Sequence, residues 1–252
     1  MNGFFQTPVV YSGNDDLPVI PESDIQRYEA PFEVDAYDHW ALNGADSSLV
    51  GLVNSHVLDK VGTTIADSGT FSMTVNTSVK NGLRSDKIDS RVQTQCAVIR
   101  VNALPTNTSA VAMLMGAFGT SVGSGVFIDN TNTLRRNFRP SVSVVDEISV
   151  ADMAGKWLFI AFSENGTAST MDSTLMLGGD TPSLLTRATG AKSASSLGIG
   201  VGQVDYSAPG TSGIVLNVAE YIVYERALSD AELLAVYGRS KKRLADRGFV
   251  IE

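Results

Sequence analysis

The sequence of 252 residues has little cysteine and histidine and no long hydrophobic run. Its one cysteine, Cys96, excludes a disulfide scaffold and a metal site built from several thiolates. The two histidines, His39 and His56, show no spacing that suggests zinc. The longest apolar stretches, such as Trp157 to Phe162, have six residues, whereas a membrane-spanning helix needs about 20. We therefore expect no segment to insert into a membrane.

The composition is typical of a globular protein rather than a disordered or fibrous one. Apolar residues make up 43% and charged residues 18%, and the mean hydropathy is +0.06. The length fits two small domains or one large all-β sandwich or barrel. No internal repeat of a solenoid or propeller is visible. The economical prediction is one domain preceded by an arm.

The net charge of −8 is unevenly distributed along the chain. Residues 1–38 contain eight acids and one base, a sum of −7, so the other 214 residues together carry only −1. A nearly neutral body offers no basic surface to nucleic acid or to an anionic membrane, and we expect neither as a main partner. The one basic cluster, Arg135, Arg136 and Arg139, is interpreted as a solvated strand face.

The opening segment is predicted to be an extended, acidic, proline-containing arm. It holds four of the eight prolines: Pro8, Pro18, Pro21 and Pro31. We assign the arm to residues 1–35 and the sandwich to residues 36–252. The arm either packs along the domain or becomes ordered against a partner. The first ten residues show no signal-peptide pattern, so we expect no export by that route.

From about Val34 onward, short apolar runs alternate with turn residues, which is typical of antiparallel strands. Segment 157–163 is apolar on both faces and should be an interior strand. The following Asn165-Gly166 favours a type I′ hairpin turn. Eight segments have strand length and are rich in β-branched or aromatic residues: 91–101, 110–118, 125–129, 134–145, 157–163, 170–177, 197–201 and 214–225.

One helix is expected, at the C-terminal end. Ser229 and Glu232 have the spacing of a capping box, flanked by Leu228 and Leu233 as a hydrophobic staple. The pattern predicts a helix over about 230–246. The apolar tail that follows, residues 249–251, should add to a sheet edge or cover a core.

Residues Gly213 to Leu234 resemble the closing motif of laminin G-like (LamG) domains, which belong to the concanavalin A-like lectin/glucanase superfamily. In that motif a glycine, a strand, an Arg-x-Leu-Ser and a short helix opened by Glu come in this order. Gly155 to Phe162 is similar to the tryptophan-bearing central strand of the family. The resemblance covers roughly residues 37–240 and implies a jelly-roll sandwich of two curved antiparallel sheets.

The segment from Glu33 to Asp38 resembles the acidic strand of laminarinase and lichenase-type glucanases, where two glutamates supply the nucleophile and the acid/base. Here Asp38 replaces the second glutamate, and the segment precedes the sandwich. We therefore expect no catalysis by Glu33 and Asp38, and no enzyme. Cys96 is interpreted as a small core residue, and Glu220 as a structural carboxylate that accepts hydrogen bonds from the backbone or from Arg226.

Sugar binding generally combines an aromatic ring with polar side chains, and two places offer this combination. Trp40 stands near Asn43, and Asp205 and Tyr206 lie in a glycine-rich loop. Trp40, Asp205 and Tyr206 are therefore the candidate ligand-binding residues. Loop aromatics that cover the edge of the core are the competing interpretation.

Calcium is the one cofactor that the resemblance implies, because LamG domains often hold it at a sandwich edge. Asp129 to Asn132 and Gly179-Asp180 offer oxygen ligands. No Asp-x-Asp series appears, and Asx residues in turns usually bind their own backbone. We assign no metal residues and leave calcium open.

The first functional hypothesis is a non-enzymatic structural protein of a bacteriophage virion, in a tail fibre, the baseplate or the capsid surface. The arm would dock onto neighbouring virion proteins, and the sandwich would serve assembly and contact with host glycans. This hypothesis implies a homo-oligomer, with a trimer as the expected form, made in the host cytoplasm. Two alternatives remain open: an exported glycan-binding module or glycoside hydrolase, and a purely architectural module.

Overall fold

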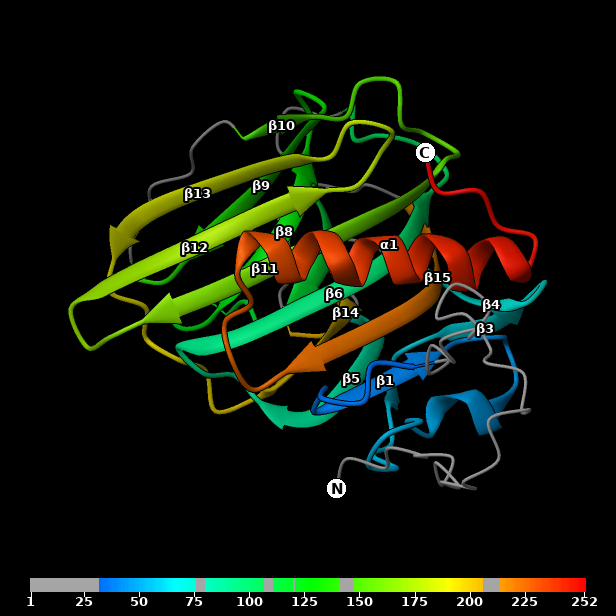
Figure 1. Cartoon of the computed structure of the whole chain (residues 1–252), viewed down its shortest axis with the longest axis horizontal. Coiled ribbons are helices and arrows are strands. Elements are labelled where there is room, and N and C mark those ends of the chain that lie inside the picture. The colour runs from blue at the N-terminus through cyan, green and yellow to red at the C-terminus, as the bar shows by residue number, and fades with distance from the viewer. Residues whose placement is uncertain (1–31, 76–79, 107–110, 120, 141–146, 206–213) are drawn as a thin grey trace, which may run out of the picture. The chain divides into compact units, whose positions relative to one another are not determined.

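The computed structural model describes residues 32–75, 80–106, 111–119, 121–140, 147–205 and 214–252. The chain divides into two units, Met1–Ala30 and Pro31–Glu252, and the first lies outside the described residues. The second unit is a sandwich of two antiparallel sheets with one helix near its C-terminal end, which confirms the predicted fold class (Figure 1). No helix in the described ranges is long and apolar enough to span a membrane.

The first sheet has the strand order β13-β12-β11-β6-β15-β4-β3, and β1 also pairs with β15. Its strands are β1 (Asp38–Ala41), β3 (Thr64–Asp67), β4 (Thr70–Val75), β6 (Val92–Val101), β11 (Trp157–Gly166), β12 (Thr170–Leu177), β13 (Ser183–Gly190) and β15 (Ile214–Tyr224).

The second sheet has the order β10-β9-β8-β7-β14-β5-β2. Its strands are β2 (Asp59–Val61), β5 (Asn81–Ile88), β7 (Val111–Gly116), β8 (Ser124–Asp129), β9 (Thr133–Phe138), β10 (Ile148–Ser149) and β14 (Gly198–Gln203). A short 3-10 helix covers Asp46–Leu49.

Strand β11 lies between β6 and β12, as its two apolar faces predict. Leu158, Ile160 and Phe162 belong to the main core cluster. The alternate residues Phe159 and Ala161 belong to a second cluster that includes residues of the helix. Because successive side chains of a strand point to opposite faces, this central strand contributes to two separate cores.

Helix α1 (Asp230–Asp246) lies across the face of the sheet formed by β11, β6 and β15 (Figure 1). Ser229 accepts a hydrogen bond from the amide of Glu232, whose side chain accepts from the amide of Ser229, so the predicted capping box is present. Tyr237 packs on Phe159, with ring centroids 5.2 Å apart. The tail then returns to the first sheet, where Ile251 pairs with Trp157.

Two local expectations are corrected. Asn165 and Gly166 are not the turn, because they still pair with Asp172 and Met171 in the ladder. The chain reverses over the next four residues, 167–170, where Thr167 N donates to the carbonyl of Thr170 and the Thr167 hydroxyl accepts from the amides of Ser169 and Thr170.

The basic cluster is also not a solvated face. Arg136 is buried and donates to Glu147, and Arg135 pairs with Asp129 at 2.6 Å. Arg139 lies over the ring of Phe118. These arginines are therefore committed to contacts within the sandwich.

Candidate functional site

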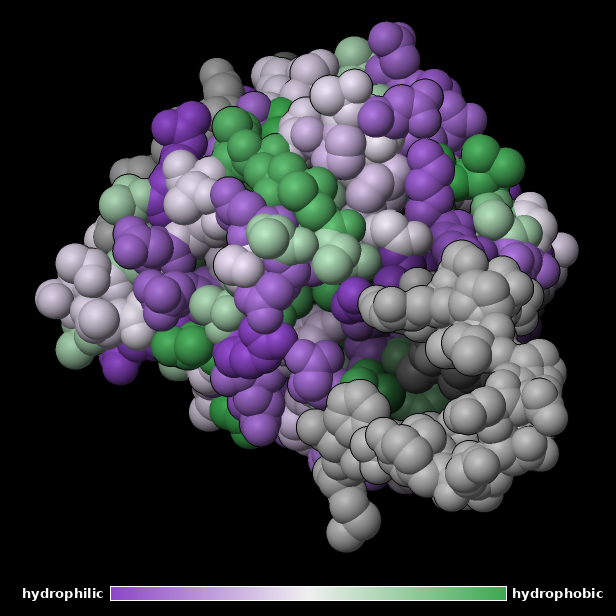
Figure 2. All heavy atoms as spheres, in the orientation of Figure 1, coloured by the Kyte–Doolittle hydropathy of each residue, from purple (hydrophilic) through white to green (hydrophobic). Residues whose placement is uncertain are grey.

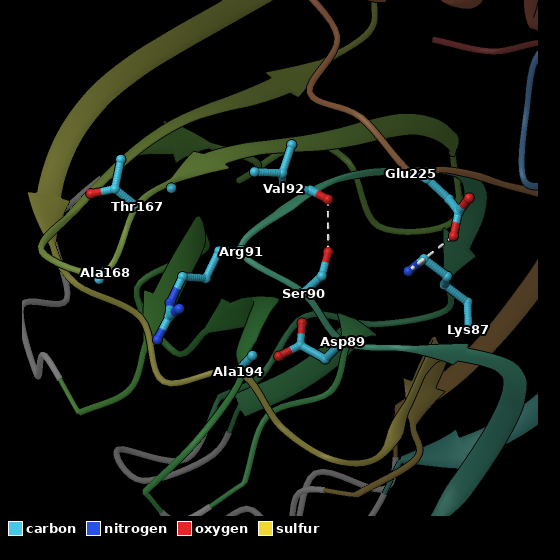
Figure 3. Close-up of a pocket in the computed structure, with 10 residues that line it drawn as sticks. Lys87, Asp89, Ser90, Arg91, Val92, Thr167, Ala168, Ala194 and Glu225 are labelled. Atoms are coloured by element: carbon cyan, nitrogen blue, oxygen red, sulfur yellow. Dashed lines mark hydrogen bonds and ion pairs between the residues drawn. The ribbon is translucent and has the colours of Figure 1, made fainter.

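An open pocket of about 690 Å³ lies at one end of the sandwich. Four chain segments meet there: the end of β5 with the start of β6, the β11–β12 hairpin, the loop before β14, and the end of β15. The lining residues are Lys87, Asp89, Ser90, Arg91, Val92, Gly166, Thr167, Ala168, Ala194 and Glu225 (Figure 3).

A buried ionic network supports the wall of this pocket. The ammonium of Lys192 lies 2.6 Å from Asp89 and 2.9 Å from Glu164, and all three side chains are fully buried. Lys192 also donates to the carbonyl of Ser90, and the amide of Gln93 donates to both carboxylates. Burial raises the pKa of Glu164 despite the adjacent ammonium. One ammonium thus lies between two carboxylates, which also accept from Gln93, and the network connects the β5–β6 connection to β11.

Exposed polar groups line the pocket above this network. Lys87 and Glu225 form an ion pair of 3.3 Å at one margin, and Thr167 lies at the opposite margin (Figure 3). The hydroxyl of Ser90 donates to the carbonyl of Val92. The pocket thus presents charged and hydroxyl groups from separate segments of the chain.

Two aromatic rings adjoin the Lys87 margin. Tyr37 and His56 are stacked with centroids 4.2 Å apart, and both are partly exposed. The Tyr37 hydroxyl donates to Asp86 at 2.9 Å, and Nδ1 of His56 lies 2.8 Å from the same carboxylate. The ammonium of Lys87 lies 5.9 Å from the centroid of the Tyr37 ring, which connects this pair to the pocket.

The pKa shifts in this pair follow from the same contacts. Burial acts to raise the pKa of Asp86, but the hydrogen bonds from His56 and Tyr37 outweigh it and lower the pKa. Burial and the adjacent Asp86 carboxylate raise the pKa of Tyr37. Asp86 is therefore held as an anion, and Tyr37 as a neutral hydroxyl that donates to it.

The predicted site residue Trp40 is not available to a ligand, which corrects that expectation. Its side chain is 0% exposed and stacks on Tyr221, with ring centroids 5.6 Å apart. Its indole N–H donates to the carbonyl of His56. Trp40 therefore belongs to the core, and its neighbour in the sequence, His39, is also buried.

The predicted site residue Asp205 does not line the pocket described above. The carboxylate of Asp205 lies 3.8 Å from Lys80 and 4.0 Å from Arg84, near the start of β5, whereas the pocket lies at the end of β5. Burial raises the pKa of Asp205. Tyr206 lies outside the described residues.

In the acidic segment that resembles a glucanase strand, both carboxylates have hydrogen-bond partners within the sandwich. Glu33 is 2% exposed, accepts hydrogen bonds from Arg239 and Arg243, and accepts from the hydroxyl of Tyr224. Burial acts to raise the pKa of Glu33, but the two arginines outweigh it and lower the pKa. Asp38 accepts from three backbone amides, at residues 39, 53 and 56. Neither carboxylate is free to act on a substrate.

Glu220 is structural, as expected, but its partners differ from the expected ones. It accepts from Nε2 of His39 at 3.0 Å and from Arg243 at 2.9 Å. Burial acts to raise the pKa of Glu220, but His39 and Arg243 outweigh it and lower the pKa to about 2. Arg226 instead pairs with Asp35 and with Glu232 of the capping box.

The expected oxygen ligands for calcium have other partners. One oxygen of Asp129 accepts from the amides of Thr131 and Thr133, and the other pairs with Arg135. Asp180 pairs with Lys241. In the described ranges, no group of three or more His, Cys, Asp or Glu side chains is placed to hold a metal. Calcium binding stays an untested expectation.

Two potential nucleophiles also have structural surroundings. Cys96 is fully buried, and burial raises the pKa of its thiol. Ser121 is the central residue of a Gly-x-Ser-x-Gly sequence, in a turn that Gly119 closes by donating to the carbonyl of Val122. Both histidines of the chain are engaged elsewhere, with Glu220 and with Asp86. The described residues therefore assemble no Ser-His-Asp arrangement.

A second pocket, of about 430 Å³, lies on another side of the β11–β12 hairpin. Its lining includes two exposed carboxylates, Asp172 and Asp230, and several hydroxyls, but no aromatic ring. Hydrophilic side chains cover much of the face of the molecule that carries α1, with hydrophobic groups between them (Figure 2). The pocket beside Tyr37 and His56 combines more of the features of a ligand site.

The sequence analysis did not identify this site. Its residues come from positions 37, 56, 86–92, 166–168, 192–194 and 225, and no local motif connects them. The one available signal was Asp86-Lys87-Ile88-Asp89, a charged stretch directly before a strongly apolar strand.

No family model matches the chain, and no curated protein matches it. Solved structures show the same fold at low identity. The receptor-binding domain of botulinum neurotoxin D has 11% identity and a TM-score of 0.55, over 82% of this chain and 53% of that chain. The binding domain of serotype G has 13% identity and a TM-score of 0.57, over 82% and 51%.

A structure of botulinum neurotoxin type C has 10% identity and a TM-score of 0.56, over 80% of this chain and 51% of that chain. The cell entry of this toxin is described as dependent on interaction with two ganglioside molecules. This chain thus spans about half the length of these structures, all of which concern binding domains or cell uptake. The comparisons establish a β-sandwich fold. They give no support to the LamG family or to a virion protein.

Proposed function

We propose that this chain is a non-catalytic carbohydrate-binding module, and that the pocket beside Tyr37 and His56 is its sugar site. One observation carries the proposal: two partly exposed aromatic rings adjoin a pocket whose wall is held in place by the buried Lys192 network. Sugars need both features, because their C–H faces pack on aromatic rings and their hydroxyls need directed polar partners.

The state of the carboxylates supports binding without catalysis. A retaining glycosidase needs two carboxyl groups about 5 Å apart that face the substrate. Asp89 is committed to Lys192, Gln93 and the amide of Ser195, and Glu225 pairs with Lys87. The pocket therefore offers no free carboxyl pair.

The fold neighbours support the same function by analogy. One is described as a receptor-binding domain and another as a binding domain, and the cell entry of a third toxin is described as dependent on gangliosides, which carry sugars. Because one fold hosts many functions, the analogy adds to the site geometry and does not replace it.

A glycan array with neutral and acidic sugars tests the proposal. The full chain should bind a subset of glycans, and Ala194→Tyr, which places a ring in the pocket, should weaken that binding by about tenfold or more. Ala66→Tyr is the control, because Ala66 is exposed on the edge strand β3, away from the pocket, and strands accept tyrosine well. Equal loss in both variants, or no bound glycan at all, would reject the proposal.

A role in a bacteriophage virion is the second candidate, and it stays a proposal. The observation that favours it is the acidic charge of residues 1–31, which precede the described sandwich and contain five acids and one base, a net −4. An acidic segment of this kind would dock onto basic surfaces of neighbouring virion proteins. In that role the same sugar site would contact host glycans, and the chain would form a homo-oligomer.

A further inference from the structure

Arg91 lies in the pocket, at the connection between β5 and β6, and is held from two sides. Its Nε donates to the carbonyl of Lys192 at 2.9 Å, and its own carbonyl accepts from the amide of Gly166 at 2.9 Å. Lys192 is itself fixed by the buried network. The guanidinium of Arg91 is therefore oriented before any ligand arrives, although the residue is exposed.

The charged side chains around Arg91 have partners other than Arg91. Lys87 pairs with Glu225 on the rim of the pocket, and the single ammonium of Lys192 lies between the carboxylates of Asp89 and Glu164 beneath it. Within the described residues, the Arg91 side chain makes one hydrogen bond, from Nε to the carbonyl of Lys192. Its two Nη groups thus leave a planar fork of N–H donors, with one positive charge, available to the pocket (Figure 3).

A planar fork with one positive charge matches a planar anion with two oxygens. Arg binds carboxylates through two parallel hydrogen bonds, and charge-assisted bonds of this kind are stronger than bonds to a neutral hydroxyl. A sugar hydroxyl would use only part of the fork and would leave the charge unpaired.

We infer that the pocket selects sugars that carry a carboxylate, and that Arg91 is the residue that binds this carboxylate. This inference rests on the proposed carbohydrate-binding function. The shared chemistry is a sugar acid, which occurs as a uronic acid or as a sialic acid. The pocket volume of about 690 Å³ is within the range of small-ligand sites, so it accommodates an acidic sugar with a neighbouring unit.

NMR titration of the full chain with two matched pairs of sugars tests the inference. Methyl β-D-glucuronide and methyl β-D-glucoside differ only in the carboxylate at C6, and 3′-sialyllactose differs from lactose by the sialic acid. In at least one pair, the acid should bind about tenfold tighter or more and should shift the amide signals of Ser90, Val92 and Thr167. The pair that responds identifies the source of the carboxylate.

Arg91→Gln should remove the preference for the acid, so that the acid and its neutral partner bind with similar affinity. Lys156→Gln is the matched control, because it removes the same charge at the other end of β11, where Lys156 is 40% exposed and lies 3.8 Å from Glu252. It should retain the preference for the acid. Unchanged amide signals outside the pocket show that the Arg91→Gln variant keeps its fold.

The failures are distinguishable. Equal binding of acid and neutral sugars at the pocket, or a preference for the acid that persists in Arg91→Gln, overturns the inference and leaves the proposed function intact. No response at the pocket to any of the four sugars, together with an array on which no glycan is bound, overturns both.

Discussion

At the scale of single residues, Glu33, Asp38 and Glu220 show how the partners of a carboxylate decide its role. Glu33 accepts hydrogen bonds from two arginines, and Asp38 accepts from three backbone amides. Glu220 accepts from His39 and Arg243. The donors lower the pKa of Glu33 and of Glu220, so these two carboxylates stay ionised near neutral pH. The acidic segment therefore anchors the start of the sandwich to β15 and α1.

Glu220 makes the stability of the sandwich dependent on acid pH. Its pKa is about 2 in the folded chain against 4.5 for an ordinary glutamate, so its contribution is complete above pH 4.5 and is lost as the pH falls toward 2. By linkage this amounts to about 3 kcal/mol of unfolding free energy. Glu220→Gln should lower stability at pH 7 and flatten the loss between pH 4.5 and 2, as measured by urea unfolding.

The control for this experiment is Asp180→Asn, an exposed carboxylate on a loop that pairs weakly with Lys241. It should leave both the stability at pH 7 and its pH dependence nearly unchanged. A Glu220→Gln variant with the same acid slope as the parent would contradict the assignment.

At the scale of elements, local hydrogen bonds decide where a segment ends. The capping box of Ser229 and Glu232 begins α1 where the sequence predicts it. In the hairpin, the Thr167 side chain caps the turn and the ladder continues through Gly166, so the reversal comes after the Asn-Gly pair. In this hairpin the Thr167 hydroxyl accepts from two backbone amides of the turn, and this places the turn after the Asn-Gly pair.

Removal of the cap should cost about 1 kcal/mol of unfolding free energy in Ser229→Ala, because an amide at the N-terminus of α1 loses its acceptor. Glu232→Ala removes the reciprocal bond to the amide of Ser229. Since the two bonds form one unit, the double variant should lose less than the sum of the single losses in a urea double-mutant cycle. Additive losses would show that the capping box is not cooperative.

At the scale of the whole molecule, the described sandwich begins before the boundary expected for the arm. Glu33 is buried among Arg239, Arg243 and Tyr224, and Asp35 pairs with Arg226. The chain divides after Ala30. The role of the preceding residues in assembly remains a prediction, and these contacts determine how to test it.

Two truncations separate assembly from folding. Deletion of residues 1–31 should reduce the mass in light scattering from an oligomer to a monomer and should leave thermal unfolding nearly unchanged. Deletion of residues 1–35 should in addition destabilise the sandwich by about 3–5 kcal/mol, because Arg243 and Arg239 lose the buried Glu33 carboxylate. An unchanged mass in both forms would reject the arm as an assembly segment, and equal stability in both would contradict the role of Glu33.

The sequence by itself determined the class of fold, the interior strand β11 and both ends of α1, because strand composition, two apolar faces and a capping box are properties of neighbouring residues. It missed the short or polar strands β1 to β5, the short strand β10 and the edge strand β13. Of these, β1 and β4 pair with β15 and β5 pairs with β14, strands far away in the sequence, whereas β3 and β13 form hairpins with neighbouring strands.

Only the tertiary structure decided the site. It buried Trp40 and left Tyr37 and His56 partly exposed, and it placed Lys192 between two carboxylates, one of which is 103 residues away in the sequence. Burial and charge pairing are properties of the packed molecule, because a side chain loses water or gains a counter-ion only when distant segments meet.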